Sequence, residues 1–314
     1  MVPTALHRAR LPLLGVLALF LAAVPSALAA DGPMAFDTPE AAAKALIDAA
    51  KANDNAALMA IYGPAGEGLV QDANDPMVQR DRAGFVKAAE ENLALEKHED
   101  GTIILVIGAN HWPLPIPLIQ KEGKWMFDAE AGKEEILARR IGKNELEAID
   151  ILQALIDAQV AYARADRDGD GVREYAQQVV STKGQKDGLY WPTEPDSDEE
   201  QSPLGPLVES LREYLSAKSK GAPFNGYYWK LLKAQGPNAP GGAHSYLING
   251  NMIAGFAVVG VPAEYMQTGV MTFLVSHHGT FLEKDLGENS LEVVKAMETY
   301  DPDDTWTEVE LPEE

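Results

Sequence analysis

Residues 146–177 read LEAIDILQALIDAQVAYARADRDGDGVREYAQ, an apolar-periodic segment that runs directly into a cluster of aspartates and glycines. Apolar residues recur every three or four positions within residues 136–164, and this period predicts a long amphipathic helix. They are Leu146, Ile149, Leu152, Leu155, Ile156 and Val160. We expect this helix to join the two halves of the chain and to end at the aspartate cluster.

The cluster, residues 166–177, has the ligand spacing of a calcium loop. In such a loop the side chains at positions 1, 3 and 5 face the ion, a glycine at position 6 permits the tight turn, and position 7 offers its backbone carbonyl. The predicted ligands are Asp166, Asp168, Asp170, the carbonyl of Val172, and Glu174 at position 9.

Two positions depart from that pattern. Position 12 is Gln177 where a bidentate glutamate is usual, and position 8 is Arg173 where an apolar residue is usual. Both departures favour weak calcium binding. Weak binding is sufficient outside the cytosol, where calcium-binding modules work with dissociation constants of about 10⁻⁴ to 10⁻³ M. A structural calcium site is therefore predicted, and the alternative is a metal-free acidic turn held by side-chain to backbone hydrogen bonds.

Residues 1–30 predict a secretory signal peptide. Arg8 and Arg10 precede an apolar run over residues 11–24, and Ala27-Leu28-Ala29 provides small residues before the cleavage point. The run is shorter than the about 20 residues of a membrane span, so we expect no stable membrane insertion after cleavage. We expect a protein that is periplasmic, in a Gram-negative bacterium, or secreted.

Composition excludes several function classes. The chain has no cysteine, which excludes disulfides, thiol nucleophiles and thiolate metal sites. Its net charge of -22, or -24 once Arg8 and Arg10 are removed, opposes binding to nucleic acid. With 46% apolar residues the chain is long enough for two globular domains. Acidic runs at residues 194–200 and 301–314 are predicted as solvated segments.

The order of elements predicts an α+β fold, with N-terminal helices on a curved antiparallel sheet, a long linking helix and a C-terminal antiparallel meander. The expected units are an α+β domain over residues 31–142, a domain with the helix, the calcium loop and the second sheet over residues 143–300, and an acidic tail over residues 301–314. Helices are predicted within residues 38–50, 82–95 and 206–217, and a further short helix is predicted after Asp54-Asn55. Strands are predicted at 102–108, 111–120, 124–128, 227–234, 245–248, 251–261, 269–276 and 280–284. Turns are predicted at Glu122-Gly123, Asn249-Gly250 and His277-His278-Gly279.

Longer segments resemble an uncharacterised family of secreted bacterial proteins, known only as a domain of unknown function. The segments are residues 112–118, 125–128, 134–142, 166–177, 187–192, 234–242 and 262–265. The resemblance covers nearly all of the mature chain and implies a periplasmic or secreted protein, without catalytic residues to carry over. By fold analogy the N-terminal half resembles nuclear-transport-factor-2-like domains, and the C-terminal half resembles the globular heads of pilins.

Other candidate sites have simpler interpretations. Residues 236–242 are glycine-rich but lack the lysine and hydroxyl of a phosphate-binding loop, so a structured loop is favoured. On a strand His277 and His278 would point to opposite faces and could not share one ion, so a role as turn residues is favoured over a metal site. Core packing is favoured over a groove for a group of aromatic residues. These are Tyr190, Trp191, Phe224, Tyr227, Tyr228 and Trp229.

The leading hypothesis is a soluble, non-catalytic cell-envelope protein with structural calcium, which binds an envelope protein or a cell-wall component. The alternative is a hydrolase that acts on an envelope polymer or glycan, with its site around Tyr227, Glu264 and His244. A third hypothesis places a small apolar ligand in the N-terminal domain, beside Trp112 and Trp125.

Overall fold

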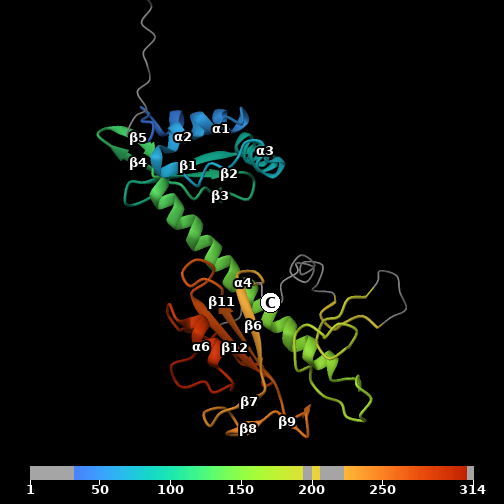
Figure 1. Cartoon of the computed structure of the whole chain (residues 1–314). Coiled ribbons are helices and arrows are strands. Elements are labelled where there is room, and N and C mark those ends of the chain that lie inside the picture. The colour runs from blue at the N-terminus through green and yellow to red at the C-terminus, as the bar shows by residue number, and fades with distance from the viewer. Residues whose placement is uncertain (1–31, 194–199, 206–222, 310–314) are drawn as a thin grey trace, which may run out of the picture. The chain divides into compact units, whose positions relative to one another are not determined.

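The computed structural model describes residues 32–193, 200–205 and 223–309, and it confirms the α+β class (Figure 1). The chain divides into two compact units after Ala129, each with its own hydrophobic core. The predicted signal peptide and the predicted helix at residues 206–217 lie outside the described residues. Within the described part, no helix combines the length and the apolar character that a membrane crossing requires.

Three α-helices open the first unit, and each begins at a side chain that caps it. They are α1 (Pro39–Lys51), α2 (Asn55–Tyr62) and α3 (Pro76–Glu91), with a short 3-10 turn, η1 (Pro64–Gly66), after α2. Thr38, Asp54 and Asp75 accept hydrogen bonds from backbone N–H groups in the first turns of α1, α2 and α3 respectively. These caps satisfy donors that the helix itself leaves unpaired, which fixes where each helix starts.

The sheet of the first unit is antiparallel, in the order β1-β2-β4-β5, with β3 also paired to β2. Its strands are β1 (Leu93–Lys97), β2 (Ile103–Ile107), β3 (Trp112–Pro113), β4 (Leu118–Lys121) and β5 (Lys124–Phe127). The predicted turn is confirmed, because Glu122 and Gly123 join β4 to β5 with φ of 53° and 78°.

Two predicted elements of this unit were wrong. The helix predicted to reach Leu95 ends at Glu91, because residues 93–97 pair with β2 as strand β1. The strand predicted over residues 111–120 is two short strands, β3 and β4. Pro115 and Pro117 lie between them, and a proline has no N–H to donate to a strand ladder.

The second unit begins with α4 (Ala129–Tyr162), which starts seven residues earlier than the sequence pattern predicts. Its buried face includes Ala148, Leu152 and Leu155. Leu146 and Val160, predicted on that face, are 64% and 46% exposed. The buried positions continue instead through Ala158 and Tyr162, so the apolar stripe is rotated from the predicted one.

The main sheet of this unit is antiparallel, in the order β14-β13-β12-β11-β6, and Figure 1 shows part of it in orange. Its strands are β6 (Tyr227–Leu232), β11 (Ala257–Pro262), β12 (Met271–Ser276), β13 (Phe281–Asp285) and β14 (Thr307–Glu308). All six residues of β11 are buried, as expected for a central strand with both faces covered. Helix α6 (Ser290–Ala296) and strand β14 were not predicted from the sequence.

Two short hairpins extend from this sheet. One pairs β7 (Ala234–Gln235) with β8 (His244–Ser245), and the other pairs β9 (Leu247–Ile248) with β10 (Asn251–Met252). Asn249 and Gly250 form the predicted turn between β9 and β10, with φ of 54° and 98°. The second hairpin carries the residues that contact the aspartate loop.

Gly260 on β11 provides a direct test of sheet packing. It lies opposite Trp229 on β6, and a Cβ at this position would lie 2.5 Å from the indole Cζ3. We expect Gly260→Ala to lower the free energy of unfolding by about 1–3 kcal/mol, because the ring has to move. The control is Gly142→Ala in α4, where a Cβ meets nothing within 4 Å and where a gain of about 0.5–1 kcal/mol is expected. Urea denaturation gives both values, and equal midpoints would contradict the packing argument.

Candidate functional site

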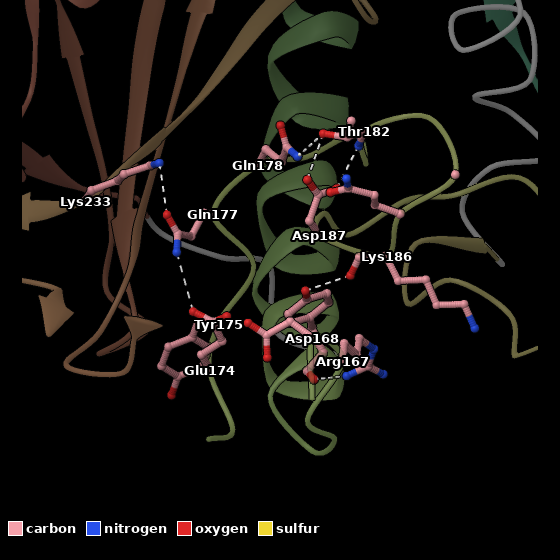
Figure 2. A pocket seen from close by; sticks show the side chains of 13 residues that line it. Arg167, Asp168, Glu174, Tyr175, Gln177, Gln178, Thr182, Lys186, Asp187 and Lys233 are labelled. Carbon is pink, nitrogen blue, oxygen red and sulfur yellow. Dashed lines mark hydrogen bonds between the residues drawn. The ribbon is translucent and has the colours of Figure 1, made fainter. Parts of the chain in front are cut away.

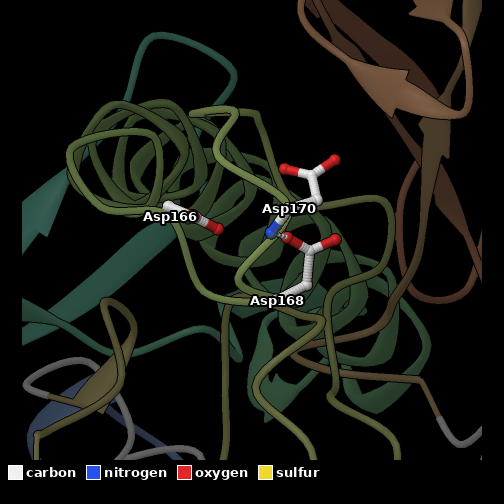
Figure 3. A group of neighbouring side chains, drawn as sticks. All are labelled: Asp166, Asp168 and Asp170. Atoms are coloured by element: carbon white, nitrogen blue, oxygen red, sulfur yellow. Dashed lines mark hydrogen bonds between the residues drawn. The ribbon is translucent and has the colours of Figure 1, made fainter.

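Asp166, Asp168 and Asp170 lie together on the loop that follows α4 (Figure 3). All three side chains are exposed, and one carboxylate oxygen of each lies within 4.8 Å of the others. This is the one group of three or more potential metal ligands found among the described residues. These three carboxylates could hold a metal ion.

The loop is held in shape by its own backbone. Gly169 and Gly171 donate to the two oxygens of Asp166 at 2.8 and 2.9 Å, and both glycines have positive φ, 81° and 89°. Such a conformation favours glycine because it has no Cβ. The two backbone hydrogen bonds hold the pKa of Asp166 below its ordinary value, so this carboxyl is ionised at neutral pH.

Two side chains that the sequence did not single out fix the ends of the loop, Arg167 at its start and Gln159 at its end. Gln159 on α4 is fully buried, and its amide accepts from Ala176 N at 2.8 Å and donates to Ala176 O at 2.9 Å. Arg167 donates to the carbonyls of Tyr162, the last residue of α4, and of Ala165, just beyond it. The Arg167 side chain is 8% exposed and forms an ion pair with Glu200 at 2.8 Å.

The hairpin β9–β10 fixes the end of the loop. Tyr175 N donates to Met252 O at 2.8 Å, and Met252 N donates to the carboxylate of Glu174 at 2.8 Å. Asn251 donates its side-chain amide to Asp170 at 2.5 Å. The loop is therefore connected to α4 at both ends, and to the hairpin through Asp170, Glu174 and Tyr175.

The structure thus brings together three of the five predicted ligands. Glu174 is not part of the group of three carboxylates, and one of its oxygens accepts the bond from Met252. Val172 donates its N–H to Asp170 at 2.7 Å. Glu174 and the carbonyl of Val172 stay predictions as ligands.

An open groove of about 840 Å³ lies beside the loop (Figure 2). Asp168 and Glu174 belong to its lining, together with residues of the segment 177–187 and with Lys233, which directly follows β6. Gln177, at the position where a calcium loop usually has glutamate, donates to Gly250 O at 2.7 Å and accepts from Lys233 at 3.3 Å. Gln177 therefore links the end of the loop to the wall of the groove.

The residues predicted for a hydrolase site lie at different ends of β6. Tyr227 is fully buried, and its hydroxyl donates to Met271 O at 2.9 Å. Glu264 is exposed and follows the end of β11 that pairs with Tyr227. His244 lies on β8, which pairs with Gln235 beyond the opposite end of β6. The six residues of β6 span about 17 Å, so these side chains do not form one site.

His277 and His278 lie in the predicted turn and not on a strand, so the divergence expected on a strand does not apply. Both follow β12, and their ring centroids lie 4.1 Å apart, since a turn does not alternate side chains as a strand does. Burial lowers the pKa of His277 below its ordinary value, and the neighbouring His278 lowers it further. Among the described residues, this pair is not part of a larger group of metal ligands.

The remaining candidates are structural. Gln235 donates to the carbonyls of Pro240 and Gly242 at 2.6 and 2.9 Å, which holds residues 236–242 as a structured loop. Trp112 is 58% exposed and lines a surface groove of about 470 Å³ between α3 and β2. Trp125 lies on β5, where it pairs with Phe36 and packs against the core, so the two tryptophans do not line that groove together.

The chain belongs to the protein family of unknown function DUF2950, whose family model matches residues 34–309. This match spans both units, including the aspartate loop and the groove. The same comparisons gave no match to a curated protein or to a solved structure. Family membership therefore leaves the activity to be argued from the geometry.

The buried amide of Gln159 gives a prediction for the loop. Gln159→Leu leaves the N–H and the carbonyl of Ala176 without partners in a buried position, and we expect the free energy of unfolding to fall by about 2–4 kcal/mol. Gln153→Leu on the same helix is the control, because Gln153 is exposed and a change within about 0.5 kcal/mol is expected. Urea denaturation measures both, and a similar loss in the two variants would refute the anchoring role.

Proposed function

We propose that this protein is a non-catalytic binding or structural protein of the cell envelope, stabilised by calcium at Asp166, Asp168 and Asp170. The observation that carries the proposal is the convergence of three exposed carboxylates within 4.8 Å, on a loop whose backbone already holds them. The carbonyl of Val172 and the second oxygen of Glu174 are the proposed further ligands. The proposed partner is an envelope protein or a cell-wall component.

Electrostatics supports a cation in this position. Three like charges at such short range repel one another, and a divalent ion replaces that repulsion with attraction. Calcium accepts six to eight oxygen ligands in a flexible geometry, whereas magnesium requires a tight octahedron. An exposed loop of aspartates and backbone carbonyls suits calcium better.

The position of the loop indicates what the ion stabilises. The loop connects the C-terminal end of α4 to β10 through the contacts of Gln159 and Met252. Neutralising the charge of the loop favours the arrangement in which the loop keeps these contacts over one in which they are broken. The proposed role of calcium is therefore structural, and it fits the millimolar calcium of an extracytoplasmic compartment.

The arrangement favours a non-catalytic role over the hydrolase. The acid and the histidine predicted for hydrolysis are separated by at least the length of β6. Paired carboxylates in glycoside hydrolases are about 5–9.5 Å apart. Glu264, at the surface, has its backbone N–H and carbonyl engaged by Thr268 within a local turn.

Calcium is expected to raise the melting temperature of the mature protein relative to EDTA. At a calcium concentration about ten times the dissociation constant, binding adds about 1.4 kcal/mol, or a rise of about 3–6 °C for a unit of this size. The double variant Asp168→Asn, Asp170→Asn is expected to lose the rise. Asparagine keeps the oxygen that accepts the loop's backbone hydrogen bonds, so the metal-free protein is expected to melt near the wild type.

The matched control removes two exposed acids outside the loop, through Glu298→Gln and Asp304→Asn. This variant is expected to keep the calcium-dependent rise, which separates a specific site from a general effect of negative charge. The proposal of a calcium site fails if wild type shows no rise, or if the loop variant and the control respond equally to calcium. Scanning calorimetry provides all these melting temperatures.

A further inference from the structure

The groove beside the aspartate loop is a further candidate binding site, and only Asp168 and Glu174 of its lining are also proposed calcium ligands. It has a volume of about 840 Å³, within the range of about 300–1,000 Å³ typical of small-molecule sites. Its lining comes from the end of α4, the segment 167–187 and Lys233, so it is assembled by the fold rather than by one stretch of sequence (Figure 2). We propose that this groove binds a short, uncharged oligosaccharide. This proposal identifies the ligand of the binding role proposed above, but it does not depend on the metal.

Without a bound ion, the lining carries three basic and three acidic side chains. The basic ones are Arg167, Lys186 and Lys233, of which the first two pair with Glu200 outside the lining, and the acidic ones are Asp168, Glu174 and Asp187. Asp187 accepts from the backbone and the hydroxyl of Thr182, both at 2.7 Å, and Glu174 accepts from Met252 N. A groove without net charge does not select a phosphate or a polyamine, and the strongly acidic chain as a whole repels anions.

The polar character of the lining excludes an apolar ligand. None of the side chains described in the lining is aliphatic and apolar, and the two aromatic ones are tyrosines. Tyr162 is 4% exposed and its ring lies 4.6 Å below the guanidinium of Arg167, which leaves Tyr175 as the half-buried aromatic surface. Peptide side chains of the apolar kind would find no matching pocket here.

The donors and acceptors of the groove match the hydroxyl groups of a sugar. Gln177, Gln178 and Gln185 contribute amides, each of which can both donate and accept. Lys233 is exposed, makes no ion pair in the described part of the chain, and uses its Nζ in a long bond of 3.3 Å to Gln177. A polyhydroxylated, uncharged ligand can satisfy such mixed groups, and a half-buried tyrosine offers a face for a sugar ring.

Titration calorimetry with the full mature chain tests the proposal. The probes are neutral tetrasaccharides of glucose, galactose, mannose and N-acetylglucosamine, with trigalacturonate and tetra-alanine as acidic and peptide comparators. We expect at least one neutral tetrasaccharide to bind with a dissociation constant below 1 mM, roughly the weak end of specific affinities. Lys233→Met and Gln178→Leu are each expected to weaken that binding at least tenfold.

The control variant is Lys295→Met, which removes an exposed lysine of α6 whose partner is Glu292 and is expected to leave the affinity unchanged. The melting temperature of each variant confirms that it folds. The proposal is overturned if no neutral tetrasaccharide binds at 1 mM, if a comparator binds more tightly, or if binding survives both groove variants.

Repeating the titration in EDTA separates the proposed sugar-binding groove from the proposed calcium site. Sugar binding without a calcium-dependent rise in melting temperature supports the groove and rejects the metal site, and the reverse result rejects the groove alone.

Discussion

Gln159 is a fully buried amide whose two polar atoms bond to both backbone groups of Ala176. A side chain that pairs in this way makes the two backbone hydrogen bonds that a neighbouring strand would make. Ala176, near the end of the loop, is therefore held against α4. Residues 160–175 therefore have to turn back within a short span. This reversal of the chain brings the three aspartates close together.

The same end of the loop is also fixed to the hairpin β9–β10, by a second pair of hydrogen bonds. Tyr175 N donates to Met252 O, and Met252 N returns a hydrogen bond to the carboxylate of Glu174 rather than to a backbone carbonyl. The carboxylate thus continues the hairpin β9–β10 toward the loop. Because Asn251 also donates to Asp170, the hairpin and the acidic loop restrain each other. A cation that balances the acids would strengthen both connections.

The sequence predicted the parts of this arrangement that depend on local spacing. The α+β class, the long helix, the turns at Gly123 and Gly250, and the aspartates at alternate positions all follow from short-range rules. The phase of α4 was wrong at Leu146 and Val160, because an apolar residue on a helix surface satisfies the same period as a buried one. Strand β1 was missed because the residues after Glu91 become a strand through pairing with β2, which is a tertiary effect. Gln159, Asn251 and Lys233 carried no local signal, since their partners lie 17, 81 and 56 positions away in the chain.

Gln177 shows how a departure from a motif acquires a physical meaning in the fold. A glutamate at this position would add two oxygens to the ion and raise its affinity. The glutamine instead donates to Gly250 O and accepts from Lys233. An ionised glutamate could not make the bond to Gly250 O, because a carboxylate has no hydrogen to donate. In place of a carboxylate at this position, the glutamine provides a link between the loop, the hairpin turn and the groove. Gln177 thus joins the acidic loop to the groove, because it lies at the end of the loop and also belongs to the lining of the groove.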